Sequence, residues 1–299
     1  MQIDISIIIP TKNAGAGFDD GLSRIYTQKT NYKYEVIVID SGSTDSTLDI
    51  IAKYPVRLIT IKPEEFGHGK TRNHGARLAT GKYLVYLTQD ALPADENWLD
   101  ILLNDIGSDE EIAGAYSRTI PRSNCDPFEA RYIAQAWGDK KEIKEILEYK
   151  KYNNKAYKKK IVFFSNISSC IQKDIWKRFP FSENIIIAED QDWSKRVLEA
   201  GYKIAYEPKS VVYHSHTHSL KELFKRYSDA GTAHKQVFGD NNNVYLLLIP
   251  LFAIIVSILD LRFMWRRGYK LSAMVRWTPK AIVRHIIEAF GFWRGLHSK

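Results

Sequence analysis

The sequence has few cysteines, and its prolines and glycines are too sparse for a fibrous chain. Two cysteines among 299 residues, Cys125 and Cys170, exclude a disulfide framework and favour a reducing compartment. Ten prolines and 17 glycines exclude a collagen-like chain, and 44% apolar with 26% charged residues exclude a disordered one. No basic segment precedes the first apolar run at Ile7, so the sequence predicts no signal peptide and a position on the cytoplasmic side.

Net charge is nearly absent outside the last forty residues. The whole chain has 43 Lys and Arg against 35 Asp and Glu, a formal charge of +8. Residues 260–299 hold nine of these cations and two of the acids, which leaves 34 against 33 for residues 1–259. The neutral body argues against nucleic acid as a partner, because such proteins carry a basic footprint. The excess of positive charge in residues 260–299 therefore indicates where the protein is located rather than which substrate it binds.

The C-terminal apolar segment is shorter than the ~20 residues that a spanning helix requires. It covers 244–259, sixteen residues interrupted by Pro250 and Ser257. Basic and aromatic residues follow it, namely Arg262, Phe263, Trp265, Arg266, Arg267, Tyr269, Lys270, Arg276, Trp277, Lys280, Arg284 and Trp293. This combination predicts that residues 241–299 form a helical extension lying peripherally on the inner face of the cell membrane. The alternatives are a helical subdomain with a solvated basic face and a helix that spans the membrane.

Apolar runs alternate with helical stretches in the first hundred residues. Near-continuous apolar runs predict buried strands at 4–10, 34–40 and 83–88, with a weaker strand at 56–61. Helices are expected between them, at 18–29, 45–53 and 70–79. This alternation predicts a doubly wound α/β half over residues 1–95.

The pattern loosens over residues 96–240, which we interpret as a second half of the same domain. A helix at 96–106, a strand at 112–120, a helix at 190–200 and strands at 203–206 and 210–214 are expected. Residues 139–160 are rich in Lys, Glu and Tyr with little periodicity, which predicts a mobile loop or a poorly buried helix. The predicted organisation is a domain at 1–240 followed by the extension at 241–299.

Four polar clusters follow the predicted strands, at 10–13, 40–45, 66–73 and 88–91. Ligands of open α/β sheets bind outside the carboxyl ends of the strands. One such cluster alone is typical of a turn or a helix cap. Four of them at equivalent topological positions predict a nucleotide pocket.

These clusters carry a family resemblance. The strings PTKN, VIVIDSGSTDST and YLTQDALP resemble the family 2 glycosyltransferases of the GT-A fold, over roughly residues 4–220. FGHGKTRNHGA together with TQDALP is similar to the branch that transfers L-rhamnose from dTDP-L-rhamnose in bacterial polysaccharide synthesis. The resemblance implies an inverting transferase of the α/β GT-A fold, with a mixed, doubly wound sheet. It also implies a lipid-linked glycan as acceptor.

The resemblance implies roles for residues of the polar clusters. Thr11 and Asp40 would contact the base and ribose, with Asp40 accepting the imide N–H of thymine or uracil. Arg72 would close over the base or the phosphates, which a guanidinium does bidentately. His68 lies in a glycine-flanked loop that allows close approach to the sugar or phosphate. The whole donor-binding set so implied is Thr11, Asn13, Asp40, Ser41, His68, Arg72, Gln89 and Asp90.

A divalent metal, Mg²⁺ or Mn²⁺, is implied by the same resemblance. The family has two acids after the fourth strand, whereas this sequence has Gln89 and Asp90, so one carboxylate remains. His214 is the candidate second ligand, and imidazole favours Mn²⁺ over Mg²⁺. The alternative is a polar strand end with exposed histidines. An ion held there would neutralise the charge that develops on a departing diphosphate.

Glu189 and Asp190 begin a predicted helix. Acids in a first helical turn favour the helix dipole, which is the simpler interpretation. The resemblance instead implies that Asp190 is the catalytic base and that Glu189 orients the acceptor or the base. Trp193 lies three residues further on and would pack against a sugar or belong to the core.

Two other functions stand as alternatives to this hypothesis. Gly15, Gly17 and Gly21, with Asp40 ending the second strand, suggest an NAD(P)-dependent oxidoreductase, but the glycines begin five residues beyond the strand. A catalytically inactive relative at the membrane surface is the other alternative, because Gln89 stands where an acid is usual.

Overall fold

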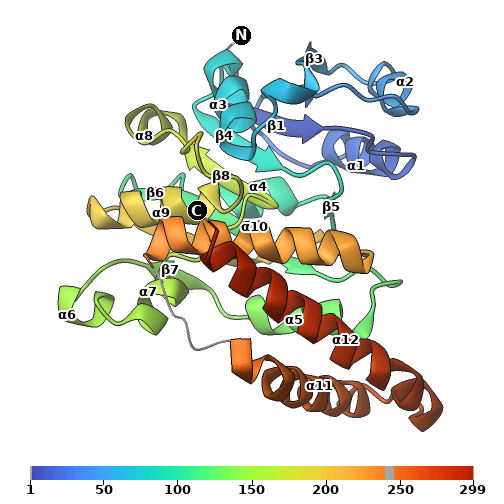
Figure 1. Ribbon diagram of the computed structural model, residues 1–299. Helices are drawn as coiled ribbons and strands as arrows, with labels where there is room; N and C mark the ends of the chain where they lie inside the picture. Colours follow the sequence, from blue (N-terminus) through green and yellow to red (C-terminus); the bar gives the residue numbers. More distant parts are fainter. Residues whose placement is uncertain (1, 240–245, 299) are drawn as a thin grey trace. The chain divides into compact units, whose positions relative to one another are not determined.

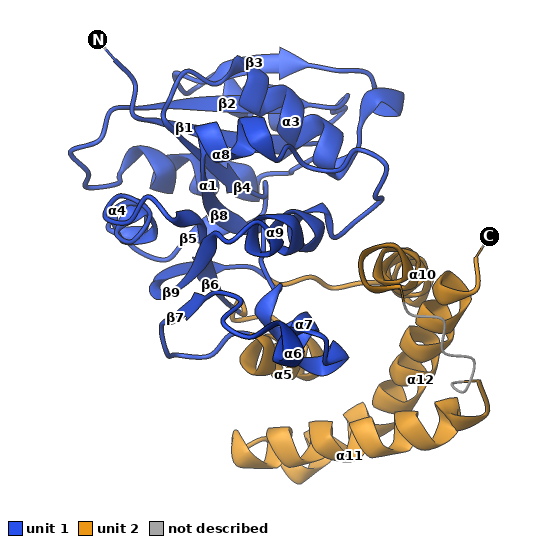
Figure 2. Cartoon of the chain, turned by 90° about the vertical axis from the view of Figure 1, so that its left-hand side faces the viewer, with its two compact units in different colours: residues 1–120, 137–214 blue, residues 121–136, 215–299 orange. Residues whose placement is uncertain are grey.

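The computed structural model describes residues 2–239 and 246–298, which form two compact units. Unit 1 comprises residues 1–120 and 137–214, and unit 2 comprises residues 121–136 and 215–299 (Figure 2). Residues 121–136 therefore belong to unit 2, and the chain then returns to unit 1 for residues 137–214. These units divide the chain at 120, 136 and 214, whereas the sequence suggested one boundary near 240.

Unit 1 is built on a nine-stranded mixed sheet in the order β3-β2-β1-β4-β8-β6-β9-β5, with β7 paired to β9 (Figure 1). The first four strands of this order are parallel, and β8 runs antiparallel to both of its neighbours. The strands are β1 (Ile5–Thr11), β2 (Tyr34–Asp40), β3 (Arg57–Thr60), β4 (Tyr83–Leu87), β5 (Leu92–Pro93), β6 (Ile112–Ile120), β7 (Glu142–Lys144), β8 (Ser168–Gln172) and β9 (Lys203–Tyr213). The predicted doubly wound half is confirmed.

The helices of unit 1 cover both faces of this sheet. Ile5, Ile7 and Ile9 of β1 join the core formed with α1, while Ile8 points to the opposite face. A Cβ atom on Gly75 of α3 would lie 2.4 Å from Ile8 Cγ2, so α3 needs a glycine there to approach the sheet. The helices of unit 1 are α1 (Gly17–Tyr26), α2 (Thr47–Ile51), η1 (Pro63–Glu65), α3 (His68–Leu78), α4 (Trp98–Leu103), α6 (Tyr149–Tyr152), α7 (Lys155–Ile161), α8 (Lys173–Arg178) and α9 (Glu189–Glu199).

One expectation for the second half is confirmed and another needs correction. Residues 139–160, expected as a mobile loop or a poorly buried helix, contain the largely exposed helix α6 and most of α7, together with the short strand β7. Lys144 is buried there, and its ammonium donates to the Tyr116 hydroxyl at 2.6 Å and to the Phe163 carbonyl at 2.8 Å. A few buried groups thus fix a segment that lacks apolar periodicity. The strands expected at 203–206 and 210–214 form the single strand β9, which bulges against β6 between them.

Unit 2 consists of helices. These are α5 (Pro127–Ala136), α10 (Leu220–Phe238), η2 (Leu246–Leu248), α11 (Ile249–Arg266) and α12 (Leu271–Leu296). α10 and α12 approach closely at glycines, because a Cβ on Gly295 would lie 1.9 Å from the Ser228 carbonyl oxygen. Within the described ranges one helical segment, Leu246–Arg266, is long and apolar enough to cross a membrane. It extends further than the 244–259 run expected from the sequence.

Candidate active site

Hydrogen bonds link the loops that follow β1, β2 and β4. Lys12 N donates to Gln89 Oε1 at 2.7 Å, and Gln89 Nε2 donates back to the Lys12 carbonyl at 3.1 Å. Asn13, at a left-handed φ of 48°, donates from its backbone to Ser43 Oγ at 2.8 Å and accepts from Thr44 N at 2.8 Å. Three of the four polar clusters predicted from the sequence therefore meet at one edge of the sheet.

The Gln89 contacts give a physical reason for the missing second acid. A side chain that bonds to both the N–H and the carbonyl of Lys12 must accept and donate. An ionised carboxylate only accepts, so it would leave the Lys12 carbonyl without this partner. Gln89 therefore serves as a cross-link between β1 and β4, which leaves Asp90 as the carboxylate of this loop.

Asp40, Ser41 and Thr11 shape the floor of the site. Asp40 is buried, and its carboxylate accepts from Gly42 N at 3.0 Å, from Ser43 N at 2.9 Å and from the Ser43 hydroxyl. Ser41 and Thr11, also buried, donate to the backbone carbonyls of Thr11 and Ile9 at 3.2 Å. Their contacts to a base or ribose stay predictions.

A buried ion pair joins α3 to α9. Arg72 Nη1 lies 2.9 Å from Glu189 Oε1, and both side chains are 5% exposed. The His68 ring, half-buried at the start of α3, lies 3.4 Å from the same Arg72 nitrogen through Nδ1. Arg72 was expected over a base or phosphate, but its guanidinium is engaged by Glu189. Its Nε, although buried, has no hydrogen-bond partner among the described residues.

Asn166 holds both carboxylates at the start of α9, and no sequence pattern marks it beyond a polar residue ahead of β8. Its backbone N–H donates to Asp190 Oδ2 at 3.1 Å, and its Nδ2 donates to Glu189 Oε1 at 3.2 Å. Ser169 fixes the Asn166 amide by donating to Oδ1 at 2.8 Å. Ala188, just before the pair, has a left-handed φ of 67°, a strained conformation that non-glycine residues adopt mainly at functional sites.

Asp190 has the protonation behaviour of a proton-transfer group. Burial, followed by the negative charge of Glu189, raises the pKa of the Asp190 carboxyl to about 7. The Asn166 N–H and Arg72 oppose that rise. An acid that only capped the helix would have its ionised form favoured by the helix dipole, so its pKa would fall. Asp190 also accepts the Gln191 N–H of the first helical turn at 2.8 Å, and the raised pKa allows this carboxyl to exchange a proton near neutral pH.

Asp90 and His214 form the candidate metal site. Asp90 follows β4 and His214 follows β9, and His214 Nε2 lies 3.4 Å from Asp90 Oδ1. The His214 side chain is 8% exposed, which contradicts the alternative of an exposed histidine at this position. When two ligand atoms each lie ~2.1 Å from the same ion, the distance between them is roughly 3.0 Å in octahedral coordination and roughly 3.4 Å in tetrahedral coordination. The spacing and the donor types therefore fit a divalent ion.

Packing decides two of the alternatives that the sequence left open. Trp193 is fully buried, with its ring centroid 5.0 Å from that of Phe164, so it belongs to the core and does not face a sugar. The glycines of the oxidoreductase alternative make no close approach, since a Cβ on Gly15 or Gly17 would meet nothing within 4 Å. The Gly15 N–H donates to Asp45 Oδ2 at 3.0 Å, so it is not free to bind a pyrophosphate.

The comparisons with known proteins place this geometry in a family. The family described as Glycosyl transferase family 2 matches residues 6–179. The O-antigen chain rhamnosyltransferase WbaN of Salmonella anatum is 33% identical over 231 residues, 77% of this chain and 71% of that protein. The O-antigen chain rhamnosyltransferase RfbN of Salmonella typhimurium is 33% identical over 233 residues, 77% of this chain and 72% of that protein.

Solved structures share the fold. The mannosyltransferase PcManGT of Pyrobaculum calidifontis, in complex with GDP-Man and Mn²⁺, has a TM-score of 0.59 at 19% identity, over 97% of this chain and 86% of that one. Glucosyl-3-phosphoglycerate synthase of Mycobacterium tuberculosis, with Mn²⁺, UDP and glucosyl-3-phosphoglycerate, has a TM-score of 0.57 at 17% identity, over 81% and 82% of the two chains. The predicted GT-A fold is thereby confirmed.

The pKa of Asp190 tests the electrostatics of this site. Glu189→Gln removes the adjacent negative charge, so the pKa of Asp190 should fall from about 7 toward its ordinary value while burial keeps it raised. Asp192→Asn, in the same helical turn but bonded to Ser182 and Arg196, is the matched control and should leave it unchanged. Carbon-13 NMR titration of the aspartate carboxyl groups measures both. An unchanged pKa in Glu189→Gln contradicts the assigned coupling.

Proposed function

Because the chain belongs to glycosyl transferase family 2, we propose that it transfers L-rhamnose from dTDP-L-rhamnose to a hydroxyl of a lipid-linked glycan. The identity of the sugar is supported by the 33% identity with the two O-antigen chain rhamnosyltransferases. A role in O-antigen synthesis is supported by the names of the same relatives, and a position on the cytoplasmic side is part of the proposal. The observation that carries the proposal is the arrangement at the start of α9, where the Asn166 N–H holds Asp190 next to the buried Arg72–Glu189 ion pair and the pKa of Asp190 is raised to about 7.

The reaction is a single displacement that inverts the anomeric carbon. The acceptor hydroxyl oxygen bonds to C1 of the sugar as Asp190 takes its proton. The bond from C1 to the phosphate oxygen breaks, and the nucleoside diphosphate leaves with the electron pair. General base catalysis of this kind contributes roughly 10²- to 10⁴-fold. Glu189 is held by Arg72 and Asn166, so it acts on the base rather than on the acceptor.

The loops at the carboxyl ends of β1, β2 and β4 form the donor side of the site. Asn13 and Gln89 connect these loops, and Asp40 and Ser41 fix the loop after β2. A donor would bind against a preformed surface, which lowers the entropic cost of binding. Thr11, His68 and the Nε of Arg72 are the remaining groups proposed to contact it.

Asp90 and His214 would hold a divalent ion, and Mn²⁺ suits this pair because it accepts imidazole more readily than Mg²⁺. Such an ion supplies Lewis-acid neutralisation of the diphosphate. The Mn²⁺ complexes of two structural neighbours support a divalent metal as cofactor.

Substitution of Asp190 tests the proposed base. Asp190→Asn should lower transfer by roughly 10²-fold or more because it cannot take the proton, while dTDP binding persists. In the wild type, transfer should rise with pH through about 7 and then level off, because the ionised carboxylate is the active form. Release of dTDP from dTDP-L-rhamnose in the presence of acceptor membranes measures the rate, and a thermal shift measures dTDP binding.

Asp192→Asn is the control for this substitution and should transfer at the wild-type rate. Transfer that persists in Asp190→Asn would show that another group is the base. A thermal shift with NAD but none with dTDP would overturn the whole proposal in favour of an oxidoreductase.

The metal assignment is tested by direct Mn²⁺ titration. Loss of a residue that only supports a metal ligand weakens metal binding by roughly 10- to 100-fold. His214→Ala removes a proposed ligand itself, so Mn²⁺ binding in the presence of dTDP should weaken by at least that much. His74→Ala, a half-buried histidine of α3, is the matched control. Electron paramagnetic resonance of free Mn²⁺ gives both constants without any transfer assay. Equal affinities for the two variants would remove His214 from the site.

Unit 2 is proposed to hold the protein on the inner face of the membrane. Apolar side chains of α11 are unusually exposed, and basic side chains are exposed at its end. The apolar ones include Leu251, Phe252, Ile254, Ile255 and Ile258, and the basic ones are Arg262, Arg266, Arg267 and Lys270. An apolar face flanked by cations favours an anionic membrane surface.

Vesicle flotation of the full chain tests this attachment. Each cation at an anionic surface contributes about 1 kcal/mol, so Arg266→Glu with Arg267→Glu should lower binding to phosphatidylglycerol vesicles roughly tenfold or more. Lys33→Glu with Lys209→Glu makes the same charge change at exposed positions of unit 1 and is the matched control. Equal losses in the two double variants would mean that attachment depends on net charge and not on unit 2.

A further inference from the structure

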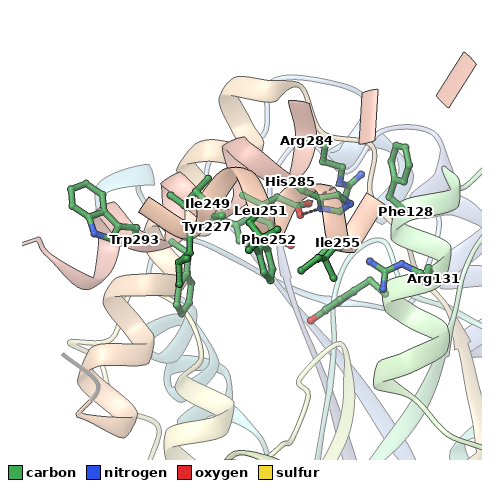
Figure 3. Close-up of a pocket in the computed structure, with 16 residues that line it drawn as sticks. Phe128, Arg131, Tyr227, Ile249, Leu251, Phe252, Ile255, Arg284, His285 and Trp293 are labelled. Atoms are coloured by element: carbon green, nitrogen blue, oxygen red, sulfur yellow. Dashed lines mark hydrogen bonds and ion pairs between the residues drawn. The ribbon is translucent and has the colours of Figure 1, made fainter. Parts of the chain in front are cut away.

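Unit 2 contains a cavity whose lining includes none of the residues assigned to the donor, the metal or proton transfer. It has a volume of about 560 Å³ and is bounded by α5, α10, α11 and α12 (Figure 3). Known small-molecule pockets range over roughly 300–1,000 Å³, so the space is large enough for a ligand. All of the residues that line it belong to unit 2.

One wall of the cavity is apolar and continuous with the exposed face of α11. Leu251, Phe252 and Ile255 line the cavity and are nevertheless 56%, 50% and 49% exposed. Apolar side chains of this size that remain half exposed mark a surface that another apolar body covers. The cavity is therefore accessible from the face that we propose lies at the membrane.

The two ends of the cavity differ in chemistry. Figure 3 shows Tyr227 and Trp293 toward one end and Arg131, Arg284 and His285 toward the other. Nine residues separate Arg284 from Trp293 on α12, which is about 13 Å along the helix axis. The space is thus long, with Tyr227 and Trp293 toward one end and the charged groups, together with Phe128, toward the other.

Every charged group at that polar end is already paired. Arg284 lies 3.0 Å from Asp126, 3.1 Å from Glu129 and 2.7 Å from Glu288. His285 contacts Asp260 at 2.6 Å and Glu288 at 2.8 Å, while Arg131 pairs with Asp260.

The cations here are thus balanced by carboxylates. Four carboxylates face two guanidinium groups and one imidazole, so no positive charge is in excess. A phosphate placed here would meet carboxylates, which argues against an anionic head group at this end of the cavity.

We propose that this cavity binds the hydrocarbon chain of the lipid that carries the acceptor glycan. The exposed wall of α11 gives the chain a path from the bilayer, and the cations Arg262, Arg266 and Arg267 at the end of α11 lie outside the cavity lining, where an anionic head group would remain. An apolar, extended space with no surplus of positive charge matches a hydrocarbon chain better than a sugar or a phosphate. The identity of the lipid rests on the proposed function, whereas the hydrocarbon chemistry rests on the cavity itself.

Photolabelling tests the occupant. The full-length chain in detergent micelles is irradiated with a polyprenyl phosphate that carries a benzophenone on its chain, and labelled peptides are mapped by mass spectrometry. We expect label on α11 and α12 that unlabelled polyprenyl phosphate displaces and that inorganic phosphate and phosphatidylglycerol do not. Equal displacement by phosphatidylglycerol would overturn the acceptor lipid as occupant, and label outside unit 2 would overturn the site.

Two variants connect the label to the cavity. Ala289→Trp fills the space from α12 and should lower labelling by about tenfold or more, because overfilled sites exclude their ligand. Leu251→Lys places a charge in the exposed wall, where folding tolerates it, and should act in the same direction. Ser272→Trp, on the exposed start of α12 outside the cavity lining, is the control and should keep wild-type labelling. Equal labelling of all three variants contradicts the proposal.

Two further measurements complete the test. One asks whether a second copy of the chain, rather than a lipid, covers the cavity wall, and the other asks whether the proposed donor site binds dTDP. Light scattering reports mass, and a doubled mass lost in Leu251→Lys would mean that a second copy of the chain covers the wall instead of a lipid. A thermal shift of the wild type with dTDP reports the donor side alone. Failure of dTDP to bind would overturn the proposed function, while absence of label with dTDP bound would overturn only the lipid site.

Discussion

The ion pair between Arg72 and Glu189 is the interaction on which the site depends. It joins α3, which packs against β1 and β2, to the start of α9, 117 residues later in the chain. A buried carboxylate beside Asp190 would be very costly without a cation, because two negative charges in a dry environment repel strongly. Arg72 neutralises Glu189, and Asp190 is left as the carboxyl that titrates near neutral pH. Asn166 and the strained Ala188 then fix the direction of both carboxylates.

A second constraint acts at the carboxyl ends of the parallel strands. The loops there are joined to one another by side chains with mixed donor and acceptor character, above all Gln89 and Asn13. Using Gln89 as a cross-link removes one carboxylate from the usual metal-binding position, and His214 at the end of β9 lies where it can replace that ligand. The departure from the family pattern thus has a structural cause and does not by itself indicate an inactive relative.

The two units carry different parts of the chemistry. Unit 1 contains every group that we assign to the donor, the metal and proton transfer. Unit 2 contains the exposed apolar helix α11, the cations that follow it and a cavity whose cations are all paired with carboxylates. The net charge of +8 therefore reflects the surface of unit 2, and the electrostatics of catalysis are set by a few buried groups in a nearly neutral body.

The parallel half of the sheet, its helices and the polar edge could be predicted from the sequence, because each is encoded by neighbouring residues. The apolar runs that form β1, β2 and β4, and the polar clusters that follow these strands, are recognisable from the local sequence alone. Long-range packing alone sets Arg72 against Glu189, bridges Glu189 and Asp190 through Asn166, and buries Trp193 in the core. It also holds residues 139–160 through Lys144 and brings α5 into unit 2. These contacts join residues far apart in the chain, and periodicity carries no information about which distant side chain a buried charge will meet.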